Sequence, residues 1–124
     1  MPSAPLRVLV VDDDAGIRRL LKRILGADGL HVVTAEDGEA ALAALQAQQF
    51  DLVILDWMLP GMDGSVVLKH LRADARTALI PVLVLSAWIT VDAAGADLTM
   101  AKPFKLEDLW AAITHLVATR VVPR

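Results

Sequence analysis

The sequence of 124 residues contains no cysteine, which excludes disulfide scaffolds, thiolate metal sites and cysteine nucleophiles. It also has no tyrosine, 4% aromatic residues, no run of Lys and Arg, and a net charge of −3. A large phosphate-binding surface is therefore not expected, and we predict no direct binding of nucleic acid. Seven Gly and six Pro are ordinary numbers, which excludes collagen-like and low-complexity chains.

Long hydrophobic runs are absent as well. The longest mostly apolar stretch, residues 81–91, is far shorter than the roughly 20 residues that cross a bilayer. Near the N-terminus, the apolar residues 8–11 lead directly into three aspartates, which is unlike a secretory signal. We therefore expect a soluble, cytoplasmic protein without membrane contact.

The residues that are present indicate a globular domain. Hydrophobic residues make up 56% and charged residues 22%, a composition that excludes a disordered chain. The length suits a single domain with a real core. We predict one domain over residues 1–124, with its core at about residues 6–119 and loose ends on either side.

Apolar runs and helical patterns alternate along the chain. Runs rich in Val, Leu and Ile predict buried parallel strands at residues 6–11, 31–35, 52–55 and 82–85, with a weaker run at 98–101. Stretches with helical spacing or propensity lie between them, at residues 17–25, 39–48, 65–72 and 106–117. Asp14 is a candidate N-cap of the first helix. This alternation predicts a doubly wound, three-layer α/β domain.

Polar residues follow the predicted strands. The first strand ends in Asp12, Asp13 and Asp14, the third in Asp56, the fourth in Ser86 and the fifth just before Lys102. Ligands of open parallel sheets bind beyond these carboxyl ends. If the first and third strands are neighbours, Asp12, Asp13 and Asp56 meet in one cleft.

Such a cluster needs positive charge. Two carboxylates about 4 Å apart repel by roughly 4 kcal/mol at an effective dielectric of 20. Lys102 supplies one positive charge, and a divalent cation would balance the rest. Oxygen ligands without nearby His or Cys favour Mg²⁺, and a small Mg²⁺ site beside a hydroxyl and a lysine suits phosphoryl transfer.

Each residue also has a structural interpretation. The three aspartates after the first strand could be turn and N-cap residues, and Asp56 could be a turn acid before Pro60 and Gly61. Ser86 could be structural, and Lys102 could lie on the surface. It is the joint occurrence at four strand ends that favours a site.

The sequence resembles the receiver domain of two-component response regulators, from about residue 6 to residue 117. The residues that carry this resemblance lie at 10–14, 51–64, 81–87, 95–97 and 102–104. The third-strand segment is especially similar to receivers that precede winged-helix DNA-binding domains. The resemblance implies a CheY-like, flavodoxin-like fold with strand order 2-1-3-4-5.

The resemblance also implies roles. Asp56 would be the phosphoacceptor, and Mg²⁺ would be bound by Asp12, Asp13, Asp56 and the backbone carbonyl of Met58. Ser86 would bond the phosphoryl group, and Lys102, before a cis bond to Pro103, would pair with its oxygens. The donor would be a phosphohistidine of a sensor histidine kinase or phosphotransfer protein, or a small donor such as acetyl phosphate. The domain would be a signalling switch rather than an enzyme.

The spacing departs from the family pattern in one place. Ser86 and Lys102 are 16 positions apart, short by roughly six residues, a little under two helical turns. The missing residues fall between Ala87 and Gly95, so we expect a shortened or missing fourth helix. It could be a loop covered by Trp88, or an element rearranged or exchanged between two chains near residues 87–101.

Two further positions bear on output and lifetime. Thr99 stands where the family commonly has Tyr or Phe, so we expect an altered output face and doubt the standard signalling dimer. In the family that the sequence resembles, the positions of Met58 and Trp88 influence attack by water on the acyl phosphate. Both are apolar, and we expect slow self-dephosphorylation.

Other functions stay open. The chain could be a receiver-like scaffold that binds a partner without phosphorylation, although the intact acids and Lys102 argue against it. A phosphohydrolase would need a cap segment that is not found. A flavin binder would need a phosphate loop where three aspartates stand.

Overall fold

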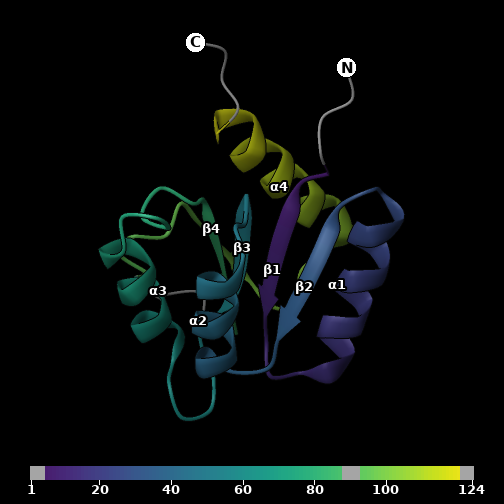
Figure 1. Cartoon of the computed structure of the whole chain (residues 1–124). Coiled ribbons are helices and arrows are strands. Elements are labelled where there is room, and N and C mark those ends of the chain that lie inside the picture. The colour runs from purple at the N-terminus through teal and green to yellow at the C-terminus, as the bar shows by residue number, and fades with distance from the viewer. Residues whose placement is uncertain (1–4, 88–92, 121–124) are drawn as a thin grey trace.

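The computed structural model describes residues 5–87 and 93–120. Its strands are β1 (Arg7–Val11), β2 (His31–Ala35), β3 (Leu52–Asp56), β4 (Val82–Ser86) and β5 (Leu98–Ala101). Its helices are α1 (Ala15–Ala27), α2 (Gly38–Ala47), α3 (Gly64–Ala73) and α4 (Leu106–Arg120). Figure 1 shows the strands side by side with helices on both faces of the sheet.

The five strands are parallel and lie in the order β2-β1-β3-β4-β5. The doubly wound fold and this order are therefore confirmed. The chain order reverses between β1 and β3, whose register pairs Val11 with Leu55. Asp12, which follows β1, and Asp56, the last residue of β3, consequently lie next to each other at the carboxyl edge of the sheet.

Side chains of alternating strand positions form two separate cores. Leu9, Val53 and Val84 pack with α2 and α3 on one face, whereas Val8, Ile54 and Leu83 pack with α1 and α4 on the other. This alternation follows from the two-residue period of a strand. Every residue of β3 and β4 is buried, as expected for central strands covered on both faces.

Two strand ends were predicted one residue too early. Asp56 belongs to β3, where it is paired with Leu85, and Ser86 belongs to β4, where it is paired with Ala101. The apolar side-chain pattern stops at residues 55 and 85. The ladder continues through the next residue of each strand, because its hydrogen bonds are formed by backbone groups whatever the side chain.

The connection from β4 to β5 confirms the expected shortened or missing helix. Residues 87 and 93–97, the described part of this connection, contain no helix. Trp88, with the rest of residues 88–92, lies outside the described residues, so its predicted packing stays a prediction. Among the described residues, no helix has both the length and the apolar character needed to cross a membrane.

A close approach at Gly64 holds α3 against the end of β3. The Gly64 N–H donates to the Trp57 carbonyl oxygen at 2.8 Å, and Asp63 caps the helix by accepting from the N–H groups of Ser65 and Val66. A Cβ atom at position 64 would lie 2.8 Å from the Asp56 carbonyl oxygen, closer than packed atoms approach. Only glycine fits here.

We expect Gly64→Ala to lower the free energy of unfolding by about 1–3 kcal/mol, because the new methyl group must displace backbone beside Asp56. Gly26→Ala is the matched control: a Cβ there meets no atom within 4 Å, and alanine favours the helix by about 0.5–1 kcal/mol. Urea unfolding measures both. An equal loss in the two variants would contradict the close-contact explanation.

Candidate functional site at the carboxyl edge of the sheet

The three aspartates after β1 have different surroundings. Asp14 caps α1 by accepting from the N–H groups of Gly16 and Ile17, so the structural interpretation holds for this residue. Asp12 is 1% exposed, and its Oδ1 accepts from the Asp14 N–H at 2.9 Å. Asp13 is exposed. Asp14 therefore belongs to the start of α1, whereas Asp12 and Asp13 lie at the carboxyl edge of the sheet.

Asp56 lies at the end of β3 and is buried, with 4% of its surface exposed. Its Oδ1 accepts from the Met58 N–H at 3.3 Å. The next residue, Trp57, donates its N–H to the Leu85 carbonyl oxygen at 2.9 Å, so β4 supports the backbone here. The backbone at Asp56 is therefore held by β4, and its carboxylate accepts a hydrogen bond from the turn that follows β3.

Lys102 joins the two buried acids. Its Nζ lies 2.7 Å from Asp12 Oδ2 and 3.3 Å from Asp56 Oδ2. Its own N–H donates to the Ser86 carbonyl oxygen at 2.7 Å, and its bond to Pro103 is cis. The surface interpretation of Lys102 is wrong, because the ammonium group has two buried partners.

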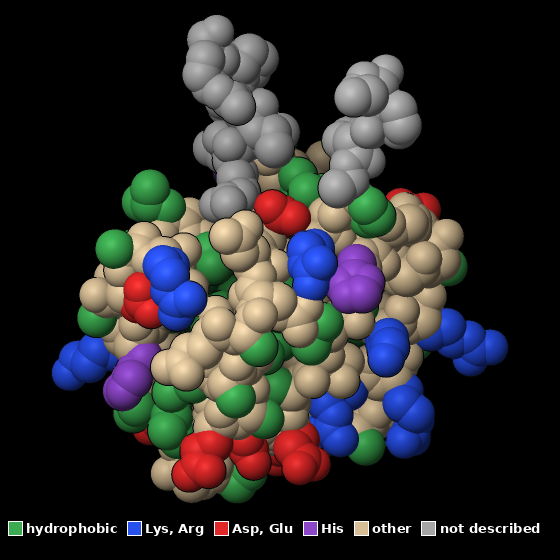
Figure 2. Space-filling view, in the orientation of Figure 1, with side chains coloured by type: hydrophobic (Ala, Val, Ile, Leu, Met, Phe, Trp, Pro, Cys, Tyr) green, Lys and Arg blue, Asp and Glu red, His purple; other side chains and the backbone are tan. Residues whose placement is uncertain are grey.

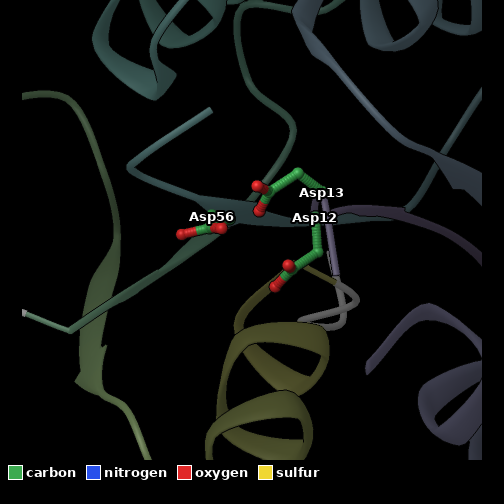
Figure 3. Close-up of side chains that lie close together, drawn as sticks. All are labelled: Asp12, Asp13 and Asp56. Atoms are coloured by element: carbon green, nitrogen blue, oxygen red, sulfur yellow. The ribbon is translucent and has the colours of Figure 1, made fainter. Parts of the chain in front are cut away.

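Carboxylate oxygens of Asp12, Asp13 and Asp56 lie within 4.8 Å of one another. In Figure 3 the Asp56 side chain extends beside those of Asp12 and Asp13. Acidic side chains also gather along the lower edge of Figure 2, toward which the arrows of β1 and β2 point in Figure 1. A set of hard oxygen donors with net charge of about −2 after Lys102 is counted fits Mg²⁺.

Burial and charge shift the pKa values of two groups. Burial, and next the charge of Asp12, raise the pKa of Asp56 to about 6, although Lys102 and the Met58 N–H act in the opposite direction. Burial of Lys102 lowers its pKa, but the hydrogen bond and charge of Asp12, together with Asp56, outweigh burial and raise it overall. The single positive charge of Lys102 therefore does not balance the three carboxylates of the cleft.

Ser86 and Met58 complete the set of predicted residues. Ser86 is fully buried at the end of β4, next to the strand that ends in Asp56. The Met58 side chain is exposed. The structure therefore brings Asp12, Asp13, Asp56 and Lys102 together, while the roles of Ser86 and of the Met58 carbonyl stay predictions.

One contact of the site was missed in the sequence. Arg18 of α1 donates from Nη1 to the Asp12 carbonyl oxygen at 2.7 Å and so holds the turn after β1. An arginine on the polar side of a helix gives no pattern that identifies a backbone carbonyl as its partner.

Comparisons with known proteins agree with this geometry. The family model for the response regulator receiver domain matches residues 8–114. The DNA-binding response regulator MtrA of Mycobacterium tuberculosis is 42% identical over 119 residues, which are 91% of this chain and 51% of MtrA. The expected similarity to receivers of DNA-binding regulators is confirmed.

Two solved structures match over almost their whole length. Chemotaxis response regulator CheY4 of Vibrio cholerae is 31% identical with a TM-score of 0.85, over 90% of this chain and 98% of CheY4. Response regulator TrrA of Thermotoga maritima, solved in complex with Mg²⁺ and BeF, is 35% identical with a TM-score of 0.80, over 90% of this chain and 98% of TrrA.

The chain spans about half the length of the curated relatives it matches. MtrA carries the words DNA-binding in its name. These relatives give no support to the prediction that nucleic acid is not bound directly, and it stays a prediction.

The pKa of Asp56 predicts a pH-dependent effect of Asp56→Asn without Mg²⁺. With a folded pKa of about 6 against an ordinary value of 3.8, ionisation of Asp56 lowers the free energy of unfolding as pH rises from about 4 through about 6. Asn removes this loss, so the variant should be more stable by about 1–3 kcal/mol at pH 8 and equal to wild type near pH 4.

Urea unfolding at several pH values tests this expectation, and Asp13→Asn, which removes an exposed carboxylate of the same cluster, is the control. Addition of Mg²⁺ should reduce the difference in free energy of unfolding between Asp56→Asn and wild type at pH 8. A gain from Asp13→Asn as large as that from Asp56→Asn would rule out burial as the cause.

Proposed function

The chain belongs to the response regulator receiver domain family of two-component systems, and on this premise we propose that Asp56 accepts a phosphoryl group. The donor is a phosphohistidine of a sensor histidine kinase or of a histidine phosphotransfer protein. The observation that carries the proposal is the buried Asp56 carboxylate beside Lys102 and two further acids. A small phosphodonor such as acetyl phosphate can replace the protein donor.

Mg²⁺ is the cofactor of this proposal. The carboxylates of Asp12, Asp13 and Asp56 and the backbone carbonyl of Met58 would hold it. When bound, it supplies the positive charge that three acids and an incoming phosphoryl group require. The donor set supports this choice, since all the carboxylates offer hard oxygen atoms within a short distance.

The transfer step follows from the positions of the side chains. An Asp56 carboxylate oxygen attacks phosphorus, an O–P bond forms, and the P–N bond to the donor imidazole breaks. Lys102, already 3.3 Å from Asp56 Oδ2, pairs with a phosphoryl oxygen and offsets the added charge. The Ser86 hydroxyl at the end of β4 donates to another phosphoryl oxygen. Positioning and charge account for the catalysis.

Phosphorylation then changes the surface. It replaces one negative charge with about two and adds acceptor oxygens. Ser86 turns to these oxygens and draws the residues after β4 toward the site, which biases a two-state surface for protein partners. The domain acts as a signalling switch rather than as an enzyme on a separate substrate. It functions as one domain with its core at about residues 6–119.

The second candidate is a receiver-like scaffold that binds its partner without phosphorylation. The altered β4–β5 connection favours it, because this connection borders the expected output face. A homodimer rearranged or swapped near residues 87–101 belongs to the same set of proposals. The complete acid cluster and its lysine favour the phosphorylated switch.

We expect wild type, incubated with acetyl phosphate and Mg²⁺, to gain one phosphoryl group, which intact mass spectrometry detects. Asp56→Asn should gain none, and removal of Mg²⁺ with EDTA should stop the reaction. Lys102→Met should react about 10²-fold more slowly, since one stabilising donor is lost.

Lys105→Met is the matched control, because Lys105 is an exposed lysine beyond Pro103, and it should react like wild type. Absence of phosphorylation in wild type, together with partner binding that Asp56→Asn leaves unchanged, would support the scaffold instead.

The aspartyl phosphate should decay slowly, because the Met58 side chain, 55% exposed, cannot orient a water molecule. Met58→Asn should shorten the half-life several-fold, and Met58→Leu should leave it unchanged. Decay after removal of the donor, followed by mass spectrometry, measures this. Fast decay in wild type that Met58→Asn does not alter would contradict the prediction.

A further inference from the structure

The strand that carries Lys102 to the site is the least firmly packed of the five. β5 has four residues, pairs only with β4, and contains no fully buried residue. β3 and β4, by contrast, are buried at every position. Since register is set mainly by burial of one face of a strand, the hydrophobic pattern of β5 specifies its register weakly.

Lys102 nevertheless depends on that register. The ladder runs from Leu83 paired with Leu98 to Ser86 paired with Ala101, and Lys102 follows directly. A slip of one residue moves the chain by about 3.3 Å and turns each side chain to the opposite face. The Lys102 ammonium, now 2.7 Å from Asp12, would leave the cleft.

Arg72 of α3 provides an attachment at the other end of β5. Its Nε donates to the Gly95 carbonyl oxygen at 2.8 Å. Its Nη1 donates to the carbonyl oxygens of Ala78 at 2.8 Å and Ile80 at 2.6 Å. A single side chain thereby joins the end of α3, the segment before β4 and the segment before β5.

Asp97 completes this attachment. Its Oδ2 accepts from Arg72 Nη2 at 2.8 Å and from the Val82 N–H at 2.7 Å, and its own N–H donates to the Val82 carbonyl oxygen at 2.9 Å. The first residue of β4 is therefore bonded twice to the residue just before β5. These bonds define one register of the two strands at the end opposite Lys102.

We propose that Arg72 and Asp97 are positioning residues that fix the register of β5 and so place Lys102 at the phosphoacceptor. Neither residue touches the acid cluster, so both act through β5. An exposed ion pair contributes little by itself, but the Arg72 guanidinium also satisfies three backbone carbonyl groups. This inference rests on the proposed function for its effect on phosphorylation, and on geometry alone for the position of Lys102.

The variants that test it are Arg72→Met, which keeps the aliphatic part of the side chain, and Asp97→Ala. Arg76→Met is the matched control, because Arg76 pairs with Asp74 in an exposed salt bridge near the same helix end. Native-state hydrogen exchange by NMR compares two amides. The Lys102 amide bonds to the Ser86 carbonyl of β4, and the Trp57 amide bonds to the Leu85 carbonyl of the same strand.

In Arg72→Met and Asp97→Ala, protection of the Lys102 amide should fall at least 10-fold while that of the Trp57 amide is kept. Phosphorylation by acetyl phosphate should slow at least 10-fold, with the Kd for Mg²⁺ unchanged or lower, because Lys102 is not a metal ligand and its departure removes a repelling charge. In a Lys102→Met background, Arg72→Met should cause no further slowing. Arg76→Met should behave as wild type in all three measurements.

Retained protection of the Lys102 amide in Arg72→Met would overturn the inference. An equal loss of protection at the Trp57 amide, or a matching loss of Mg²⁺ affinity, would overturn it too, because either result indicates that the whole domain is destabilised. If wild type is not phosphorylated at all, the proposed function fails, and the exchange of the two amides still decides the inference.

Discussion

Three carboxylates at the end of a parallel sheet repel one another, and the Lys102 ammonium group is the one cation of the described residues that contacts two of them. At the separations in this cleft, each unbalanced pair costs roughly 4 kcal/mol at an effective dielectric near 20. Burial further disfavours the charged form of Asp56, and together with the charge of Asp12 it raises the pKa of this residue to about 6 despite the lysine. The described residues of the cleft carry more negative charge than Lys102 balances, so an additional cation would be bound favourably there.

The fold delivers these groups from segments far apart in the chain. β1 and β3 are neighbours although β2 lies between them in sequence, so Asp12 and Asp56 meet where the strand order reverses. Gly64 lets α3 approach the end of β3 closely, and Asp14 starts α1 directly after the acids. Each local choice of residue therefore serves the position of a carboxylate as well as the stability of an element.

Most of the fold and the acid cluster could be predicted from the sequence, because apolar runs, helical spacing and polar strand ends are local patterns. The shortened β4–β5 connection was also predictable, from the spacing between Ser86 and Lys102. The contacts of Arg72 with the segments before β4 and before β5 were not predictable. Arg72 bonds backbone carbonyls of Ala78, Ile80 and Gly95, and a carbonyl group has no signature in a sequence. The hydrogen bond from Arg18 to the Asp12 carbonyl oxygen could not be predicted for the same reason.

Two tryptophans of the described residues lie in different layers. Trp57 follows Asp56 directly and packs with the core under α2 and α3, whereas Trp110 packs with the core on the opposite face of the sheet. Indole fluorescence responds to electric fields and to nearby water. Trp57 is therefore an optical probe one peptide bond from the carboxyl residue whose pKa is raised, and Trp110 is a second indole on the opposite face of the sheet.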